Sequence, residues 1–239
     1  MKSLSDLVRD VRGMRQTGPS AGTVALIFLL AAAVYAFFAI ADEVSEDEIA
    51  AIDSGILLAF RDPANLARPL GPAWLADTMG DITALGGYPV LVILVASIVG
   101  FLTIWGRHRS ALFLLVAVIT GTLVSQGLKI LYDRPRPDLV DHLVSTHTAS
   151  FPSGHATMSA VVYLTLAAMI IRLVDRRAIR AYVLCVAVAL TVLVGVSRIY
   201  LGVHWPSDVA AGWALGAAWA SLSWLAVSVI RSYRNRKGR

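Results

Sequence analysis

Six stretches of the chain contain no Asp, Glu, Lys or Arg, and the charged residues gather between them. The stretches cover residues 21–41, 88–106, 110–128, 154–171, 181–197 and 209–230. An α-helix needs about 20 apolar residues to cross the roughly 30 Å hydrocarbon core of a bilayer. Because each stretch is close to that length, the pattern predicts an all-α, polytopic membrane protein with six transmembrane helices.

The first stretch has a second interpretation. It follows a basic segment and ends in Ala39-Ile40-Ala41, which is typical of a signal-peptidase site. The apolar region of a signal peptide is usually about 7–15 residues long, and this stretch is longer. We therefore interpret residues 21–41 as an uncleaved transmembrane helix.

The distribution of charge predicts the side of the membrane on which each connecting segment lies. The net charge is +5, and 15 of the 21 Lys and Arg residues fall in four segments that hold only three acids. These segments are 1–20, 107–109, 172–180 and 231–239. Cytoplasmic loops carry an excess of Lys and Arg, so we expect these four segments, and both termini, to be cytoplasmic. The outward-facing segments are then 42–87, 129–153 and 198–208.

The same pattern divides the chain into three parts. We expect residues 1–20 to form an amphipathic segment on the inner leaflet, and residues 21–230 to form one six-helix membrane domain. The basic tail, residues 231–239, is expected to contact lipid headgroups rather than nucleic acid. Residues 42–87 are interrupted by Arg and Pro, so we expect them to lie along the outer interface with Trp74 as an anchor.

The last apolar stretch contains Gly212 and Gly216, a GxxxG spacing. We interpret this spacing as close helix packing rather than as a signal for dimer formation. The sequence leaves the oligomeric state open.

Polar clusters occur where the third, fourth, fifth and sixth apolar stretches meet the outer segments. They are KILYDRPRPD (129–138), FPSGHA (151–156), Ser197-Arg198 and HWPSD (204–208). Odd-numbered helices end, and even-numbered helices begin, on the same side of the membrane. We therefore expect all four clusters to meet at the outer face. Charge is costly near hydrocarbon, so such residues are functional candidates.

The cations of these clusters suit a phosphate group. Lys129, Arg136 and Arg198 can neutralise a phosphate dianion, and guanidinium groups offer forked hydrogen bonds to its oxygens. Ser153 and Gly154 precede a helix, where free N–H groups and the helix dipole favour an anion. Each residue also has a structural alternative: the cations could extend from a helix end to the interface, and Ser153 could be only an N-cap.

Two histidines and one carboxylate complete the set. His204 and Asp208 are four residues apart, so the carboxylate can hold one ring nitrogen and leave the other as a nucleophile. His155 is the candidate general acid for the leaving group. Asp208 could instead be only a favourable charge at a helix start. The role of Arg134 stays open, and we prefer to interpret it as a surface charge near Asp133.

At these residues the sequence resembles the type 2 phosphatidic acid phosphatase family, which shares its motifs with the vanadium haloperoxidases. The first motif is Lys129, six residues, then Arg136-Pro137; the second is Pro152-Ser153-Gly154-His155. The third is Ser197-Arg198, five residues, His204, three residues and Asp208. The motifs span residues 129–208. Residues 1–87 carry no motif that we assign.

The resemblance implies a membrane lipid phosphate phosphatase that works through a phosphohistidine. His204 would be the nucleophile, Asp208 would orient it, and His155 would protonate the leaving oxygen. The phosphate would be bound by Lys129, Arg136, Ser153, Gly154 and Arg198. No metal or other cofactor is expected, because Asp208 is the only acid that we find at the motif core.

The expected partners are membrane lipids and a lipid phosphate substrate, with no nucleic acid. Undecaprenyl diphosphate is our first candidate substrate, and the alternatives are phosphatidic acid, phosphatidylglycerol phosphate and lipid A phosphate. The expected location is a bacterial inner membrane with the site facing outward. Two other hypotheses stay open: phosphotransfer between lipids, and a transporter or lipid-binding protein that uses the cations only to hold an anion.

Overall fold

The computed structural model describes residues 21–145 and 148–237, most of which lie in helices. The longer helices are α2 (Ala21–Ser45), α5 (Tyr88–Ile104), α6 (His108–Tyr132), α7 (Gly154–Ile171), α8 (Arg177–Tyr200) and α9 (Pro206–Lys237). Each of the six apolar stretches therefore forms a helix, as predicted. The amphipathic segment expected at residues 1–20 lies outside the described residues.

Five of these helices, α2, α6, α7, α8 and α9, are long and apolar enough to cross a membrane. Helix α5 has 17 residues and follows α4 (Ala73–Ala84) after a bend of 42°. The bent pair α4–α5 gives a sixth span if it is counted as one. The apolar helices thus support an integral membrane protein with five or six spans.

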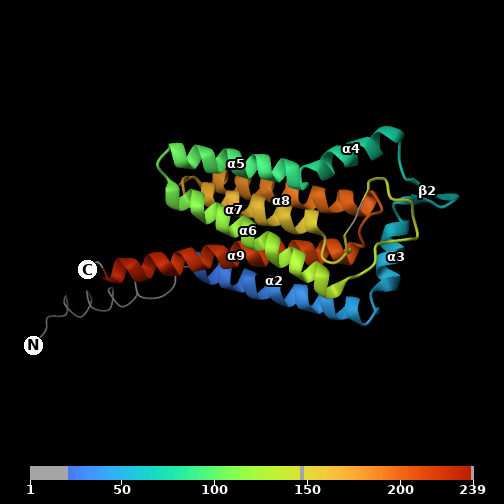
Figure 1. Ribbon diagram of the computed structural model, residues 1–239, viewed down its shortest axis with the longest axis horizontal. Coiled ribbons are helices and arrows are strands. Elements are labelled where there is room, and N and C mark those ends of the chain that lie inside the picture. The colour runs from blue at the N-terminus through green and yellow to red at the C-terminus, as the bar shows by residue number, and fades with distance from the viewer. Residues whose placement is uncertain (1–20, 146–147, 238–239) are drawn as a thin grey trace, which may run out of the picture.

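Helix α7 lies at the centre of the bundle. It packs against α8 and α9, and α2 lies along α9 (Figure 1). Most α7 side chains in the two turns after its start are buried, including Met158, Val161 and Val162, and they pack against Leu91 of α5 and Leu114 of α6. A helix that is apolar all round is expected at the centre of a bundle, where neighbours cover every face.

The glycines of the GxxxG spacing bring α9 close to α7. A Cβ atom on Gly212 would lie 2.9 Å from Ser153 O, and one on Gly216 would lie 2.4 Å from Ala160 Cβ. Small residues allow such a close approach of two helix backbones. The interpretation as close packing within the chain is confirmed.

Residues 42–87 contain regular structure that the sequence did not reveal. They form α3 (Ala50–Leu58), a two-stranded antiparallel hairpin of β1 (Arg61–Asp62) and β2 (Asn65–Pro69), and α4. The all-α prediction therefore missed a small hairpin. The buried Arg61 donates to Tyr200 O at 2.8 Å, and Tyr200 Oη donates to Leu70 O at 2.8 Å, which attaches the hairpin to the end of α8.

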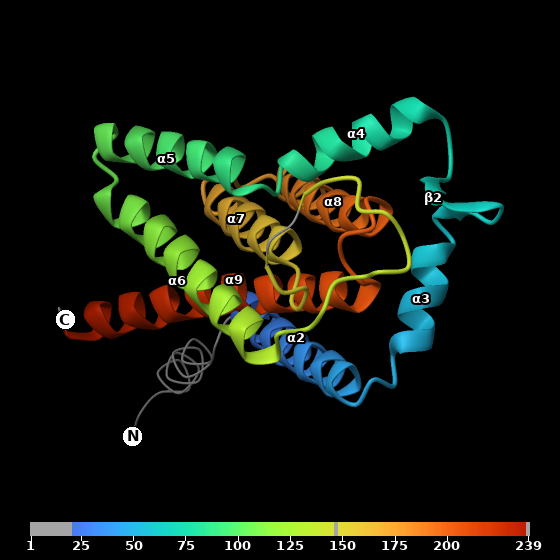
Figure 2. The ribbon, with the colours of Figure 1, turned by 45° about the vertical axis from the view of Figure 1, so that its right-hand side comes forward.

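The ends of the helices that carry the polar clusters lie together. Helices α6 and α8 end, and α7 and α9 begin, at the right of Figure 1, near α3 and the hairpin. The turned view shows the loop from α6 to α7 crossing this end of the bundle (Figure 2). The basic turns after α5 and α7 lie at the opposite end.

Candidate active site

The turn from α8 to α9 places His204 and Asp208 side by side. Gly202 has a φ of 77°, a left-handed conformation that glycine adopts without strain. Pro206 then begins α9, where its missing N–H is not needed. His204 Nδ1 lies 3.4 Å from Asp208 Oδ2, a long contact for a hydrogen bond, and both side chains are buried.

The contacts of His204 define which ring nitrogen carries the proton. Arg136 Nη1 lies 3.2 Å from His204 Nε2. A guanidinium group can only donate hydrogen bonds, so Nε2 accepts and Nδ1 carries the hydrogen toward Asp208. Burial lowers the pKa of His204 to about 3, and the nearby Arg198 and Arg136 act in the same direction against the effect of Asp208. The imidazole is therefore neutral, with its Nε2 lone pair facing a cation.

Asp208 is held by several donors besides His204. Its Oδ2 atom accepts hydrogen bonds from Trp205 N at 2.9 Å and from Ser150 Oγ. Its backbone carbonyl accepts from Ser153 N at 2.9 Å, which joins the second motif to the third. These contacts fix the carboxylate beside Nδ1.

The three predicted cations surround the histidines. Arg136 donates from Nε to Thr148 O at 2.8 Å and from Nη1 to Val203 O, and burial lowers the pKa of its guanidinium below the usual value. Lys129 Nζ donates to Ala149 O. Backbone carbonyls hold these two side chains in place but do not neutralise their charge.

Arg198 is the third cation and lies on the last turn of α8. Its Nη1 donates to Thr83 Oγ1 at 3.1 Å, and its buried Nε has no hydrogen-bond partner among the described residues. A buried guanidinium with an unused donor is suited to an anionic oxygen.

Helix α7 contributes its N-terminus to the same place. Ser153 is the N-cap, and its Oγ accepts from Ala156 N at 3.5 Å. A Cβ on Gly154 would lie 3.5 Å from Lys129 Cε, so the first and second motifs meet here. The N–H of Ser153 is already bonded to Asp208 O, so the open donors of a helix start would come from the residues after it.

His155 lies on the first turn of α7, beside the bend between α4 and α5. A Cβ on Gly87 would lie 3.7 Å from His155 Nε2. His155 is close enough to Arg198 and His204 to interact with them electrostatically. The structure thus brings all eight predicted residues to one site, from four helix ends and the loops that join them.

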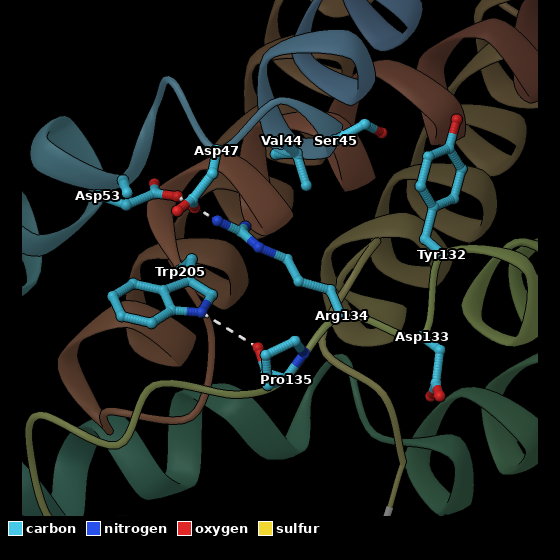
Figure 3. Close-up of a pocket in the computed structure, with 10 residues that line it drawn as sticks. Val44, Ser45, Asp47, Asp53, Tyr132, Asp133, Arg134, Pro135 and Trp205 are labelled. Carbon is cyan, nitrogen blue, oxygen red and sulfur yellow. Dashed lines mark hydrogen bonds and ion pairs between the residues drawn. The ribbon is translucent and has the colours of Figure 1, made fainter.

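The interpretation of Arg134 as a surface charge near Asp133 is wrong. Arg134 extends toward Asp53 of α3, whereas Asp133 points away from it (Figure 3). Its Nη2 lies 2.9 Å from Asp53 Oδ2 and its Nη1 lies 2.7 Å from Asp208 Oδ1. Asp208 is therefore not the only acid near the motif core, because Arg134 forms ion pairs with both Asp208 and Asp53.

The sequence did not reveal four polar residues that form hydrogen bonds or ion pairs with Arg134, Asp208 and the phosphate-binding arginines. They are Asp53, Thr83, Thr148 and Ser150. Only Asp53 had a signal, as the one charged residue in the apolar segment 49–60. Among the described residues, no three His, Cys, Asp or Glu side chains are placed as metal ligands would be.

The fold and the site together define a helical membrane protein with a buried His–Asp pair and three cations beside it. Residues 110–232 match the PAP2 superfamily, and the chain belongs to this superfamily.

Named relatives agree with this assignment. The chain is 35% identical over 146 residues to phosphatidylglycerophosphatase B of Bacillus subtilis (strain 168), covering 60% of this chain and 70% of that protein. It is also 35% identical over 127 residues to decaprenylphosphoryl-5-phosphoribose phosphatase of Mycobacterium tuberculosis (strain ATCC 25618 / H37Rv), covering 52% and 65%.

A solved structure has the same fold. The transmembrane PAP2-type phosphatidylglycerolphosphate phosphatase from Bacillus subtilis superposes with a TM-score of 0.72 at 28% identity, covering 82% of this chain and 94% of that one. These similarities support an enzyme, a membrane lipid phosphate phosphatase, over a transporter that only holds an anion.

Proposed function

We propose that the protein hydrolyses a lipid phosphate without a metal ion, through a phosphohistidine on His204. The observation that carries the proposal is the contact between Arg136 and His204 Nε2. It places the nucleophilic lone pair beside a group that binds phosphate, in a buried and neutral imidazole. Asp208, on the other side of the ring, would stabilise the positive charge that forms on the ring during attack.

The first step breaks the bond between the terminal phosphorus and the oxygen that joins it to the rest of the lipid. His204 Nε2 attacks phosphorus, while Lys129, Arg136 and Arg198 stabilise the charge on the phosphate oxygens. His155 gives a proton to the departing oxygen. The products of this step are the lipid alcohol, or the lipid monophosphate when the substrate is a diphosphate, and a phosphohistidine.

The second step releases phosphate. Water attacks the phosphohistidine, His155 takes a proton from that water, and the bond between nitrogen and phosphorus breaks. The enzyme returns to its starting state with inorganic phosphate as product. If a lipid alcohol took the place of water, the same intermediate would give phosphotransfer, so the products must be identified.

For the substrate we propose phosphatidylglycerol phosphate beside undecaprenyl diphosphate. Phosphatidylglycerol phosphate gains support from the Bacillus subtilis relatives, whose names carry this activity. Release of inorganic phosphate from both lipids, with phosphatidic acid and lipid A phosphate in the same panel, tests the proposal. No phosphate release from any of them above the His204→Ala background would contradict it.

For the topology we propose that both termini are cytoplasmic and that the site faces outward, in a bacterial plasma membrane. The basic turns lie at the end of the bundle opposite to the site, which supports this orientation. In a Cys185→Ala background, a cysteine at the exposed Glu46 should react with an impermeant thiol reagent in intact cells. A cysteine at the exposed Asp175 should not, and the reverse pattern would contradict the orientation.

A further inference from the structure

A second buried carboxylate lies behind the His204–Asp208 pair. Asp53 is only 1% exposed, although it comes from α3, far from the motifs in sequence. Arg134 connects it to Asp208, with contacts of 2.9 Å to Asp53 Oδ2 and 2.7 Å to Asp208 Oδ1. A buried ion pair needs further hydrogen bonds to offset the cost of removing its charges from water.

Those further hydrogen bonds come from the first turn of α9. Ser207 N donates to Asp53 Oδ1 at 2.8 Å, and Ser207 Oγ donates to Asp53 Oδ2. Arg134 Nη1 also donates to Ser207 Oγ at 2.8 Å. Because Ser207 lies between His204 and Asp208, Asp53 holds the segment that carries both residues.

The two oxygens of Asp208 have separate partners. Oδ1 contacts Arg134, whereas Oδ2 contacts His204, Ser150 Oγ and Trp205 N. Arg134 therefore fixes the rotation of the carboxylate so that Oδ2 faces the imidazole. Its positive charge also weakens the ability of Asp208 to stabilise a positive ring, and the negative charge of Asp53 offsets that effect.

We propose that Asp53 and Arg134 are positioning residues for the phosphohistidine step. They orient Asp208 and keep one net negative charge on the Asp53–Arg134–Asp208 cluster. The inference rests on the proposed function, because it assumes that His204 is the nucleophile and that Asp208 supports it. It adds a requirement for two residues that are not among the fixed positions of the three motifs: Arg134 is a spacer residue of the first motif, and Asp53 lies outside all three.

A cavity beside this cluster contains a second carboxylate that can serve as a matched control. It has a volume of about 320 Å³, and its lining includes Asp47, Asp53, Arg134 and Trp205 (Figure 3). Asp47 lines the same cavity but is exposed to solvent. Replacing Asp47 removes the same formal charge from the same region without removing the buried partner of Arg134.

The test compares kcat and KM for Asp53→Asn, Arg134→Gln, the double variant and the control Asp47→Asn. Asp53→Asn should lower kcat roughly 10- to 100-fold, the loss that removal of supporting hydrogen-bond partners typically causes at metal sites. KM should change little, because the phosphate-binding cations are unchanged and ground-state binding is therefore retained. Asp47→Asn should behave like the natural protein.

The double variant separates positioning from simple structural damage. Asp53→Asn leaves the cluster neutral and Arg134→Gln leaves it with two negative charges, whereas the double variant restores one. Its kcat should therefore exceed the value expected by multiplying the two single losses, since coupled residues are not additive. Rates are expressed per site able to form the phosphoenzyme, so that a smaller folded fraction does not lower the measured kcat.

An unchanged kcat in Asp53→Asn, or a loss equal to that of Asp47→Asn, would overturn the proposal even if Arg134→Gln does not fold. Independent losses in the double variant would also overturn it. Failure of the proposed function would look different, because a phosphoenzyme would then persist in His204→Ala.

Discussion

Substitution of Gly216 by alanine should push α9 away from α7. The added Cβ would lie 2.4 Å from Ala160 Cβ and 2.7 Å from Thr157 O. Neither atom belongs to a flexible side chain that can turn away, so the helices themselves must move. Overpacking of this kind typically costs about 1–3 kcal/mol of the free energy of unfolding.

Gly127→Ala is the matched control. Gly127 lies on α6 and has no atom within 4 Å of the position that a Cβ would occupy. Both substitutions gain the helix propensity of alanine, roughly 0.5–1 kcal/mol, so the difference between them isolates the steric cost. Denaturant titration in detergent micelles should place Gly216→Ala about 1–3 kcal/mol below Gly127→Ala.

Activity should follow the same order. The hydrogen bond from Ser153 N to Asp208 O crosses the contact between α7 and α9, so moving the helices apart also displaces the carboxylate from His204. We expect Gly216→Ala to lose kcat and Gly127→Ala to retain it. Equal stability and equal kcat in the two variants would refute the close packing on which this reasoning depends.

Two further predictions concern the chemistry. His155→Ala should retain relatively more activity on p-nitrophenyl phosphate than on a lipid phosphate, because nitrophenolate can depart without receiving a proton. A general acid typically accelerates departure of a poor leaving group about 10²- to 10⁴-fold. Equal losses on both substrates in steady-state assays would show that His155 is not the general acid. Activity should survive EDTA and should be inhibited by vanadate, which mimics the phosphoryl transition state. Loss of activity in EDTA that magnesium or zinc restores would contradict a metal-independent mechanism.

That the predicted site residues lie close together could be inferred from the sequence, because polar residues at these positions are costly. Lys129 and Arg198 lie in the last turns of apolar helices and His204 lies in the turn between two of them, where charged and polar residues are costly and therefore functional candidates. The direction of each helix then decides which ends meet. The same logic predicted the six helices, since a stretch that can cross a bilayer is defined by its length and composition.

The supporting residues could not be found in this way. Arg134 and Asp53 are 81 residues apart, and their contact depends on where α3 packs against α9. No periodicity in residues 42–87 encodes that placement, because the segment mixes a short helix, a hairpin and a second helix. Thr83, Thr148 and Ser150 carry no charge, so their place in the site depends on tertiary contacts alone.

The most direct test of the account is to trap the covalent intermediate. The enzyme is mixed rapidly with radiolabelled lipid phosphate and quenched with alkaline detergent, because the nitrogen–phosphorus bond of phosphohistidine is stable in alkali and hydrolysed in acid. We predict an alkali-stable, acid-labile label that maps to His204 and is absent from His204→Ala. A label that persists in His204→Ala, or that maps to another residue, would contradict it.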